Sequence, residues 1–364
     1  MNRFIKALSV LALILALTGV APTIEINTAF AESNSASAVI EVSSGRFLHV
    51  ANGDQRLPMA STTKVMTALV VLEHCELNEV VTVPAAAVGV EGSSMYLRKG
   101  DQRTVEELLF GLMLRSGNDA AVCLALHTSG NIESFAELMN EKAAELGARN
   151  TSFVNPHGLH DDNHYTTAKD LAIISAAAMK NPDFRRIVGS KVARFDDRVY
   201  YNKNKMLSSY EGATGVKTGY TKVAGRCLVS SSERNGMEIV CVVLNCYDMW
   251  ERSKTLMTQA HETYSLVNLT ERLPLQEVDV EGGVEQNVNV SVRGPIAYPL
   301  SVKEADSVRY EIFLPSKLIA PVKEGAVAGK IDIFVDNCLI FSENLYTIKH
   351  VRKRSILDWF KELV

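Results

Sequence analysis

Basic residues are not concentrated anywhere in the body of this 364-residue chain. Its 38 lysines and arginines are outnumbered by 42 aspartates and glutamates, which gives a formal net charge of −4. Proteins that bind nucleic acids usually present a basic patch or stripe to the phosphate backbone. The charge distribution therefore gives no support to nucleic acid as a partner.

The six cysteines lack the C-x-x-C spacing that is typical of zinc and redox sites. Most of them lie in apolar segments, where cysteine behaves as a small core residue. An even number would permit disulfides in an exported protein, but a chain of this length can be stable without them. We therefore expect free thiols, no metal site and no cofactor. The cysteines are Cys75, Cys123, Cys227, Cys241, Cys246 and Cys338.

The apolar run near the N-terminus, residues 7–21, is too short for a comfortable transmembrane helix. The basic residues of MNRFIK precede it, and Ala29-Phe30-Ala31 follows as an A-x-A cleavage site. This order is typical of a secretory signal peptide. We predict a signal peptide at residues 1–31 and a mature protein outside the cytoplasm. The alternative is an uncleaved membrane anchor.

The order of elements over residues 32–270 predicts an α/β domain with an antiparallel sheet, flanking helices and an inserted helical cluster. A Ser-Ser-Gly turn within residues 38–50 predicts two strands, and the Asn235-Gly236 turn predicts a hairpin over residues 224–246. Thr104 and Glu107 form a T-x-x-E pattern, which predicts a capping box at the start of a helix that ends at Ser116. Further helices are predicted after Ser61 and at residues 118–129, 133–147, 167–179 and 251–267.

The helical pattern disappears after Leu273. Residues 273–348 hold short strand-like segments separated by Gly and Pro, which predicts a small all-β domain. The tail at residues 350–364 combines basic residues with an apolar helical face, which predicts an amphipathic helix on a membrane surface. The alternative is a helix docked on the β-domain. The basic residues are Arg352, Lys353 and Arg354, and the apolar ones are Ile356, Trp359, Phe360 and Leu363.

A polar Ser-Thr-Thr-Lys sequence interrupts the apolar segment that begins at Pro58. Residues three apart lie on the same face of a helix, so Ser61 and Lys64 are expected to be neighbours. A serine hydroxyl becomes a good nucleophile when an adjacent base takes its proton, and Lys64 can be that base if its pKa is lowered. The alternative is that Ser61 only caps the helix and Lys64 extends into solvent.

Two more motifs follow in the order S-x-x-K, S-x-N, K-T-G. Ser116-Gly117-Asn118 lies at a junction between two predicted helices, and Lys217-Thr218-Gly219 precedes the predicted strand hairpin. Each is weak alone, but their order and their places at a helix start, an interhelical loop and a strand edge are specific together.

With these motifs, the chain resembles the low-molecular-weight penicillin-binding proteins, the exported serine D-alanyl-D-alanine carboxypeptidases of the penicillin-binding protein 5 type. The resemblance extends over MASTTKVMTAL, SMYLRKGD, LMLRSGNDAAVCLA, NPHGLHDDNHYTTAKDLA, GVKTGYT, the β-rich C-terminal region and the terminal helix. It implies the serine β-lactamase/DD-peptidase-like fold. The three motifs alone are shared with serine β-lactamases, so the flanking segments favour the carboxypeptidase.

The resemblance also implies roles for the motif residues. Ser61 would be the nucleophile and Lys64 its base, with the charge of Lys217 close by to keep Lys64 deprotonated. Ser116 would pass a proton toward the leaving nitrogen, and Asn118 would orient Lys64 and the substrate amide.

The resemblance places the remaining roles on the third motif. Lys217 and Thr218 would hold the terminal carboxylate of the substrate, and Gly219 would let its backbone approach the strand. The N–H groups of Ser61 and Tyr220 would be the oxyanion donors. Relatives often carry a further arginine near the start of the last helix, and Arg252 lies nearby but is not assigned to the site.

The implied substrate is a peptidoglycan pentapeptide ending in D-Ala-D-Ala, from which the enzyme would release the terminal D-alanine. β-Lactams would acylate Ser61. The terminal helix would attach the exported enzyme to the outer face of the cytoplasmic membrane. A D,D-endopeptidase uses the same residues and stays an open alternative.

Three alternative functions are weighed against the carboxypeptidase. His157, His160, Asp161, Asp162 and His164 could hold a metal, although the Asn-Pro-His-Gly opening favours a structural loop. A class A β-lactamase needs an E-x-x-L-N segment, but His74 and Cys241 occupy the Glu positions before the two Leu-Asn pairs. A non-catalytic wall-binding or β-lactam-sensing protein would usually have lost the nucleophile or base, and both are present.

Overall fold

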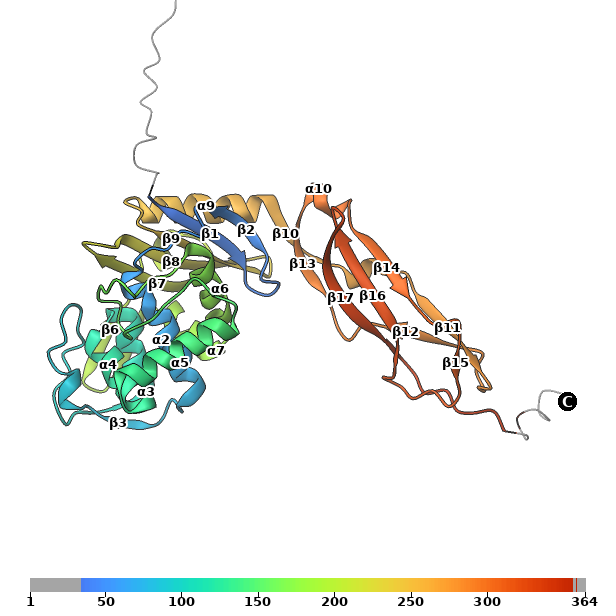
Figure 1. Cartoon of the computed structure of the whole chain (residues 1–364), viewed down its shortest axis with the longest axis horizontal. Coiled ribbons are helices and arrows are strands. Elements are labelled where there is room, and N and C mark those ends of the chain that lie inside the picture. Colours follow the sequence, from blue (N-terminus) through green and yellow to red (C-terminus); the bar gives the residue numbers. More distant parts are fainter. Residues whose placement is uncertain (1–33, 356–357, 359–364) are drawn as a thin grey trace, which may run out of the picture. The chain divides into compact units, whose positions relative to one another are not determined.

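The computed structural model describes residues 34–355 and residue 358 of the chain (Figure 1). The predicted signal peptide and most of the predicted terminal helix therefore lie outside the described residues. Within the described part, no helix combines the length and the apolar character that crossing a membrane requires.

The first structural feature is a five-stranded antiparallel sheet in the order β2-β1-β9-β8-β7. Both predicted hairpins are present. Asn235 and Gly236 join β8 to β9 with φ angles of 51° and 77°, and two positive φ values are the mark of the turn that Asn-Gly favours. The strands are β1 (Ala36–Glu41), β2 (Phe47–Ala51), β7 (Ala213–Thr221), β8 (Gly225–Arg234) and β9 (Met237–Leu244).

Alternate residues of these strands enter two different cores, as the two-residue period of a strand requires. Val39 and Cys241 pack with α9 (Met249–Thr263) on one face of the sheet. Ile40 and Val240 point the other way, toward α6 (Ala168–Met179) and the helical cluster (Figure 1). The sheet is therefore buried on both faces.

The helical cluster contains the helices that the sequence predicts around the motifs. Thr104 caps α3 by accepting the N–H of Glu107 at 3.1 Å, as predicted. The second hydrogen bond of a capping box would run from the Thr104 N–H to the Glu107 carboxylate. This part of the prediction is wrong, because the carboxylate accepts the hydroxyl of Tyr200 at 2.8 Å instead. The elements are η2 (Ala60–Thr63), α2 (Lys64–His74), α3 (Val105–Phe110), the π-helical η4 (Gly111–Arg115), α4 (Asn118–Ser129) and α5 (Ile132–Glu145).

Several short elements were not predicted. Helix α7 (Pro182–Gly189) has an Asn181 cap and a proline in its first turn, which is a start signal that the sequence does contain. The others are two helical turns that are too short to show a helical period, and two pairs of short strands that depend on each other. They are η3 (Ala85–Ala87), α8 (Met206–Ser209), and the pairs β3 (Val80–Thr82) with β4 (Gln102–Thr104) and β5 (Val192–Phe195) with β6 (Arg198–Tyr201).

The last helix of this region ends at Thr263, four residues before the predicted end. Residues Tyr264–Asn268 form strand β10, which pairs with β13 (Ala297–Ser301). The prediction was wrong here because a partner strand far along the chain supplies the hydrogen bonds, and a local pattern does not reveal that partner.

The C-terminal region is the predicted all-β domain, and its helical elements as far as Ser355 are the short turns η5 (Thr270–Arg272) and α10 (Val302–Ala305). Its six-stranded sheet has the order β14-β16-β17-β12-β11-β15. Val290, Ile331 and Leu345 lie in its core. The strands are β11 (Gln276–Glu281), β12 (Asn287–Ser291), β14 (Arg309–Phe313), β15 (Leu318–Ile319), β16 (Val327–Val335) and β17 (Cys338–Thr347).

The predicted terminal helix does not begin at His350. Val351 is buried and pairs with Val322, and Lys353 pairs with Gly283, so this segment is an extended part of the β-domain. At Ser355 the pattern changes: its N–H and hydroxyl bind the Asp358 carboxylate, while its hydroxyl accepts the Asp358 N–H. This reciprocal pair has the hydrogen-bond pattern of a capping box.

Candidate active site

Ser61 lies in the turn η2, directly before α2. The residue before it, Ala60, has a φ of 48°, which an L-residue adopts only when its surroundings hold it. The caps of η2 and α2 are Met59 and Thr63, and neither makes a side-chain capping bond. Ser61 is therefore not the helix cap of the alternative interpretation.

Lys64 is completely buried at the start of α2. Its Nζ lies 3.1 Å from Ser61 Oγ, 2.7 Å from Asn118 Oδ1 and 2.6 Å from the carbonyl oxygen of His157. The lysine therefore does not extend into solvent, and the predicted pairing of Ser61 with Lys64 is present.

These three contacts fit an ammonium that donates to all three oxygens, and they also fit an uncharged amine that faces the serine. A neutral amine has two N–H donors and one lone pair. The two oxygens of Asn118 and His157 can only accept, so they use both donors. The lone pair is then left for the hydroxyl proton of Ser61, which is the geometry that a general base needs.

Burial and the charges around Lys64 favour the uncharged amine. Burial is the main reason that the pKa of Lys64 lies well below its usual value, and the charges of Lys217 and Lys203 lower it further. The carboxylate of Asp119 partly opposes them. Burial and Lys203 also lower the pKa of Lys217, to about 7.

The second motif enters the site where helix η4 ends. Ser116 is buried and terminates η4 with a φ of 65°. Two residues later, the Asn118 side chain bridges Lys64 Nζ and the carbonyl of Glu91, to which its Nδ2 donates at 2.5 Å. Both ends of the amide are therefore engaged, and this fixes which end faces the lysine.

The third motif lies on β7, the terminal strand of the sheet, which pairs with β8 along one edge. Lys217 is buried and its Nζ donates to the carbonyl of Thr218 at 3.0 Å. A Cβ on Gly219 would lie 3.1 Å from the backbone nitrogen of Ser61. The strand backbone therefore approaches the serine so closely that any side chain larger than that of glycine would require the two segments to shift apart. The Tyr220 side chain, by contrast, is 65% exposed.

The loop that follows Asn155 supports the serine turn. A Cβ on Gly158 would lie 1.9 Å from the carbonyl oxygen of Ala60, so the two backbones are in direct contact. Thr67 donates its hydroxyl to the Pro156 carbonyl at 2.6 Å. The same loop supplies the His157 carbonyl to Lys64.

The histidines of this loop are engaged with the protein. His164 Nδ1 accepts the N–H of Val154 at 3.1 Å, so its proton lies on Nε2, which is 2.8 Å from Thr63 Oγ1. Burial lowers the pKa of His164 to about 4 and that of His157 to about 3. These contacts give the loop a structural role, as the sequence favoured over a metal site.

Three contributors to the site were not predicted. Asp119 is buried and accepts the N–H groups of Met95 and Leu97, which holds the segment beside Asn118. Lys203 contributes charge, and the His157 carbonyl contributes an acceptor. Asp119 adjoins the S-x-N motif and could have been noticed there, whereas a carbonyl acceptor leaves no signal in a sequence.

Comparisons with known proteins find similar chains that extend over most of this one. Residues 24–248 match the family described as D-alanyl-D-alanine carboxypeptidase, and residues 264–353 match the penicillin-binding protein 5 C-terminal domain. D-alanyl-D-alanine carboxypeptidase DacF of Bacillus subtilis is 30% identical over 349 residues, 91% of this chain and 89% of the relative. DacC of Escherichia coli is 32% identical over 334 residues, 86% of this chain and 83% of the relative. The crystal structure of penicillin binding protein 5 from Haemophilus influenzae superposes with a TM-score of 0.74 at 31% identity, and covers 87% of this chain and 97% of that one.

Proposed function

This chain belongs to the D-alanyl-D-alanine carboxypeptidase family of serine peptidases, and from that membership we propose how its own residues carry out the reaction. The single observation that carries the proposal is the buried contact of 3.1 Å between Lys64 Nζ and Ser61 Oγ. It places a base within reach of the proton that the nucleophile must lose.

In the acylation step, Ser61 Oγ attacks the carbonyl carbon of the D-Ala–D-Ala peptide bond, and its proton passes to Lys64. The tetrahedral intermediate then collapses, and the C–N bond breaks. The leaving nitrogen takes a proton from Lys64, with Ser116 as the relay. D-Alanine departs, and the acyl group remains on Ser61 as an ester.

The developing oxyanion is held by the N–H groups of Ser61 and Tyr220. The close approach of Gly219 to the Ser61 nitrogen supports this assignment, because it brings strand β7 beside the serine turn. Loss of one such donor typically lowers the rate by about 10²–10³. Lys217 and Thr218 bind the terminal carboxylate of the substrate, and Asn118 orients the substrate amide.

In the second step, water attacks the acyl-enzyme and Lys64 takes its proton, which releases the shortened stem peptide and restores Ser61. The substrate is a peptidoglycan pentapeptide ending in D-Ala-D-Ala. A β-lactam enters by the same first step but leaves an ester that hydrolyses slowly. Endopeptidase activity needs no other residues, and it would be detected as cleavage of cross-linked peptides.

The test is release of D-alanine from a diacyl-D-Ala-D-Ala peptide, together with covalent labelling by penicillin. Ser61→Ala should abolish both, whereas Ser208→Ala, an exposed serine in α8, should behave as the wild type. Labelling that survives in Ser61→Ala would place the nucleophile elsewhere. Penicillin turnover within seconds would identify a β-lactamase instead, and labelling without D-alanine release would identify a sensor.

We extend the proposal to the location of the enzyme. Residues 1–31 form a cleaved signal peptide, residues 32–270 the catalytic domain and residues 273–348 the β-domain, and a terminal helix attaches the protein to the outer face of the cytoplasmic membrane. The capping box at Ser355 supports a helix that begins after it, within the predicted range of 350–364.

A truncation tests the membrane attachment. Removal of residues 356–364 keeps the buried Val351 in the β-domain, so the protein should stay folded and active. It should lose binding to vesicles that contain anionic phospholipid. Unchanged vesicle binding would contradict the membrane role of the tail and favour a helix that docks on the protein.

A further inference from the structure

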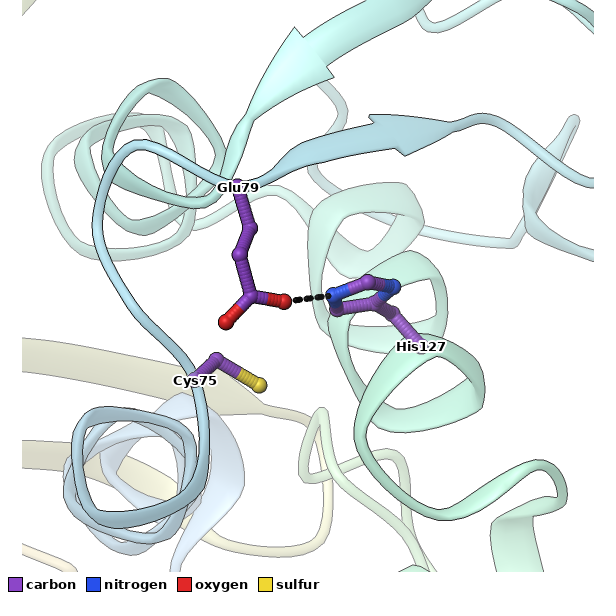
Figure 2. A group of neighbouring side chains, drawn as sticks. All are labelled: Cys75, Glu79 and His127. Carbon is purple, nitrogen blue, oxygen red and sulfur yellow. Dashed lines mark hydrogen bonds and ion pairs between the residues drawn. The ribbon is translucent and has the colours of Figure 1, made fainter.

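Three side chains with metal-binding atoms meet away from the active site. Cys75, Glu79 and His127 each offer one ligand atom, and these atoms all lie within 4.8 Å of one another. Figure 2 shows Cys75 and Glu79, on the segment that follows α2, facing His127 on α4. None of them takes part in the proposed reaction.

The cluster lies at the C-terminal ends of two helices that begin in the active site. Cys75 is the residue that ends α2, and His127 is in the last turn of α4. Glu79 precedes strand β3. Helix α2 starts with Lys64 and has 11 residues, so the cluster is about 16 Å along the helix from the catalytic amine.

Hydrogen bonds orient the three side chains, and one of these bonds joins His127 to Glu79. One carboxylate oxygen of Glu79 accepts the N–H of Glu76, and the other lies 3.0 Å from His127 Nε2. The sulfur of Cys75 lies 3.4 Å from the hydroxyl of Thr128. The carboxylate, the imidazole and the thiol therefore face a common point before any ion binds.

We propose that Cys75, Glu79 and His127 form a site for a divalent transition-metal ion of the zinc class, with water as the fourth ligand. A thiolate and an imidazole select zinc-like ions over magnesium and calcium, which prefer oxygen ligands. Metal–ligand bonds of about 2.0–2.3 Å at tetrahedral angles place the ligand atoms about 3.3–3.8 Å apart, so a pair at the 4.8 Å limit must approach by up to about 1.5 Å, and His127 Nε2 must move slightly away from Glu79. Rotation of partly exposed side chains suffices for this change.

The local charges suit a cation. Cys75 and His127 lie at the negative ends of the α2 and α4 dipoles, where a positive ion is stabilised. Glu79 adds a full negative charge. Binding releases the thiol proton of Cys75 to solvent, so the site gains a thiolate. It also replaces the hydrogen bond between His127 and Glu79: the proton on His127 Nε2 passes to solvent and Nδ1 carries the proton of the imidazole, which leaves the Nε2 lone pair for the ion.

A bound ion would join the distal ends of α2 and α4 to the segment that leads into β3. Their other ends carry Lys64 and Asn118, which bind each other in the active site. The ion therefore stabilises the fold of the helical cluster. It does not touch the reacting atoms.

Cobalt(II) is the probe, because a thiolate ligand produces a near-ultraviolet charge-transfer band and a tetrahedral site produces intense visible bands. The purified protein, freed of metal by chelation under reducing conditions, should show both bands and lose them when one equivalent of zinc is added. Cys75→Ser should abolish the charge-transfer band. His127→Gln should weaken affinity at least about tenfold, the smallest effect expected from disturbing a metal site.

Cys338→Ser is the matched control, because Cys338 is the exposed thiol of the β-domain. It should bind cobalt as the wild type does. Zinc at about a hundredfold excess over its Kd should raise the Tm of the wild type by roughly 5–10 °C and leave Cys75→Ser unchanged. Absence of a charge-transfer band in the wild type, or a band that depends on Cys338 instead of Cys75, would overturn the proposal.

Discussion

Replacement of Gly219 by alanine tests the contact between strand β7 and the serine turn. The new Cβ would lie 3.1 Å from three backbone atoms: the carbonyl oxygen of Met59 and the nitrogens of Ser61 and Thr62. Ordinary contacts of this kind begin at 3.4 Å, so the strand and the turn must separate by about 0.3 Å. Backbone atoms in two packed elements yield less easily than a flexible side chain does.

We expect this separation to misplace the Ser61 N–H and the strand edge that binds substrate. A misplacement of about 1 Å can cost about 10² in rate, and loss of a whole oxyanion donor costs about 10²–10³. Gly219→Ala should therefore lower kcat/KM for D-alanine release by about 10–100-fold. The rate of acylation by penicillin should fall similarly, because both reactions use the same donors.

Gly189→Ala is the matched control. A Cβ there would meet the carbonyl oxygen of Thr214 at 3.0 Å, which is an equally tight contact with the same strand, but near its opposite end. This variant should lose thermal stability to a similar extent and keep its kcat/KM. If Gly219→Ala kept kcat/KM within twofold of the wild type, the close approach would not serve catalysis.

Two further predictions concern charge. Lys217 has a pKa of about 7 in the folded protein against a usual value near 10.5, so between these pH values the unfolded chain holds a proton that the folded protein has released. The free energy of unfolding of the protein should therefore rise by about 1.4 kcal/mol per pH unit in this range. Denaturant titrations at several pH values should show that Lys217→Met lacks this contribution to the pH dependence. An equal slope in both proteins would contradict the lowered pKa. Asp119→Asn should destabilise the fold by about 1–3 kcal/mol, because Met95 and Leu97 lose a charged acceptor. It should also shift the acidic limb of the kcat/KM profile to lower pH, because Asp119 raises the pKa of Lys64; an unmoved limb would contradict Lys64 as the base.

Local patterns predicted most of the secondary structure around the site. The Asn235-Gly236 turn, the Thr104 cap and the apolar helix after Ser61 all depend on interactions between residues a few positions apart, which a sequence displays directly. The predictions failed at the end of α9 and at His350. In both places a strand partner distant in sequence determines the conformation.

The sequence by itself determined which chemical groups are present. It also determined that Ser61 and Lys64 are neighbours, because three residues make about one helical turn. Only the tertiary structure decided that Lys64 has a lowered pKa and can act as a base toward Ser61. The low pKa of Lys64 depends on its burial and on the charges of Lys217 and Lys203, which lie more than a hundred residues away. The absence of C-x-x-C spacing likewise predicted no metal site, whereas folding brings Cys75 and Glu79 to His127. Burial and long-range Coulomb interactions arise from packing, so a one-dimensional pattern does not contain them.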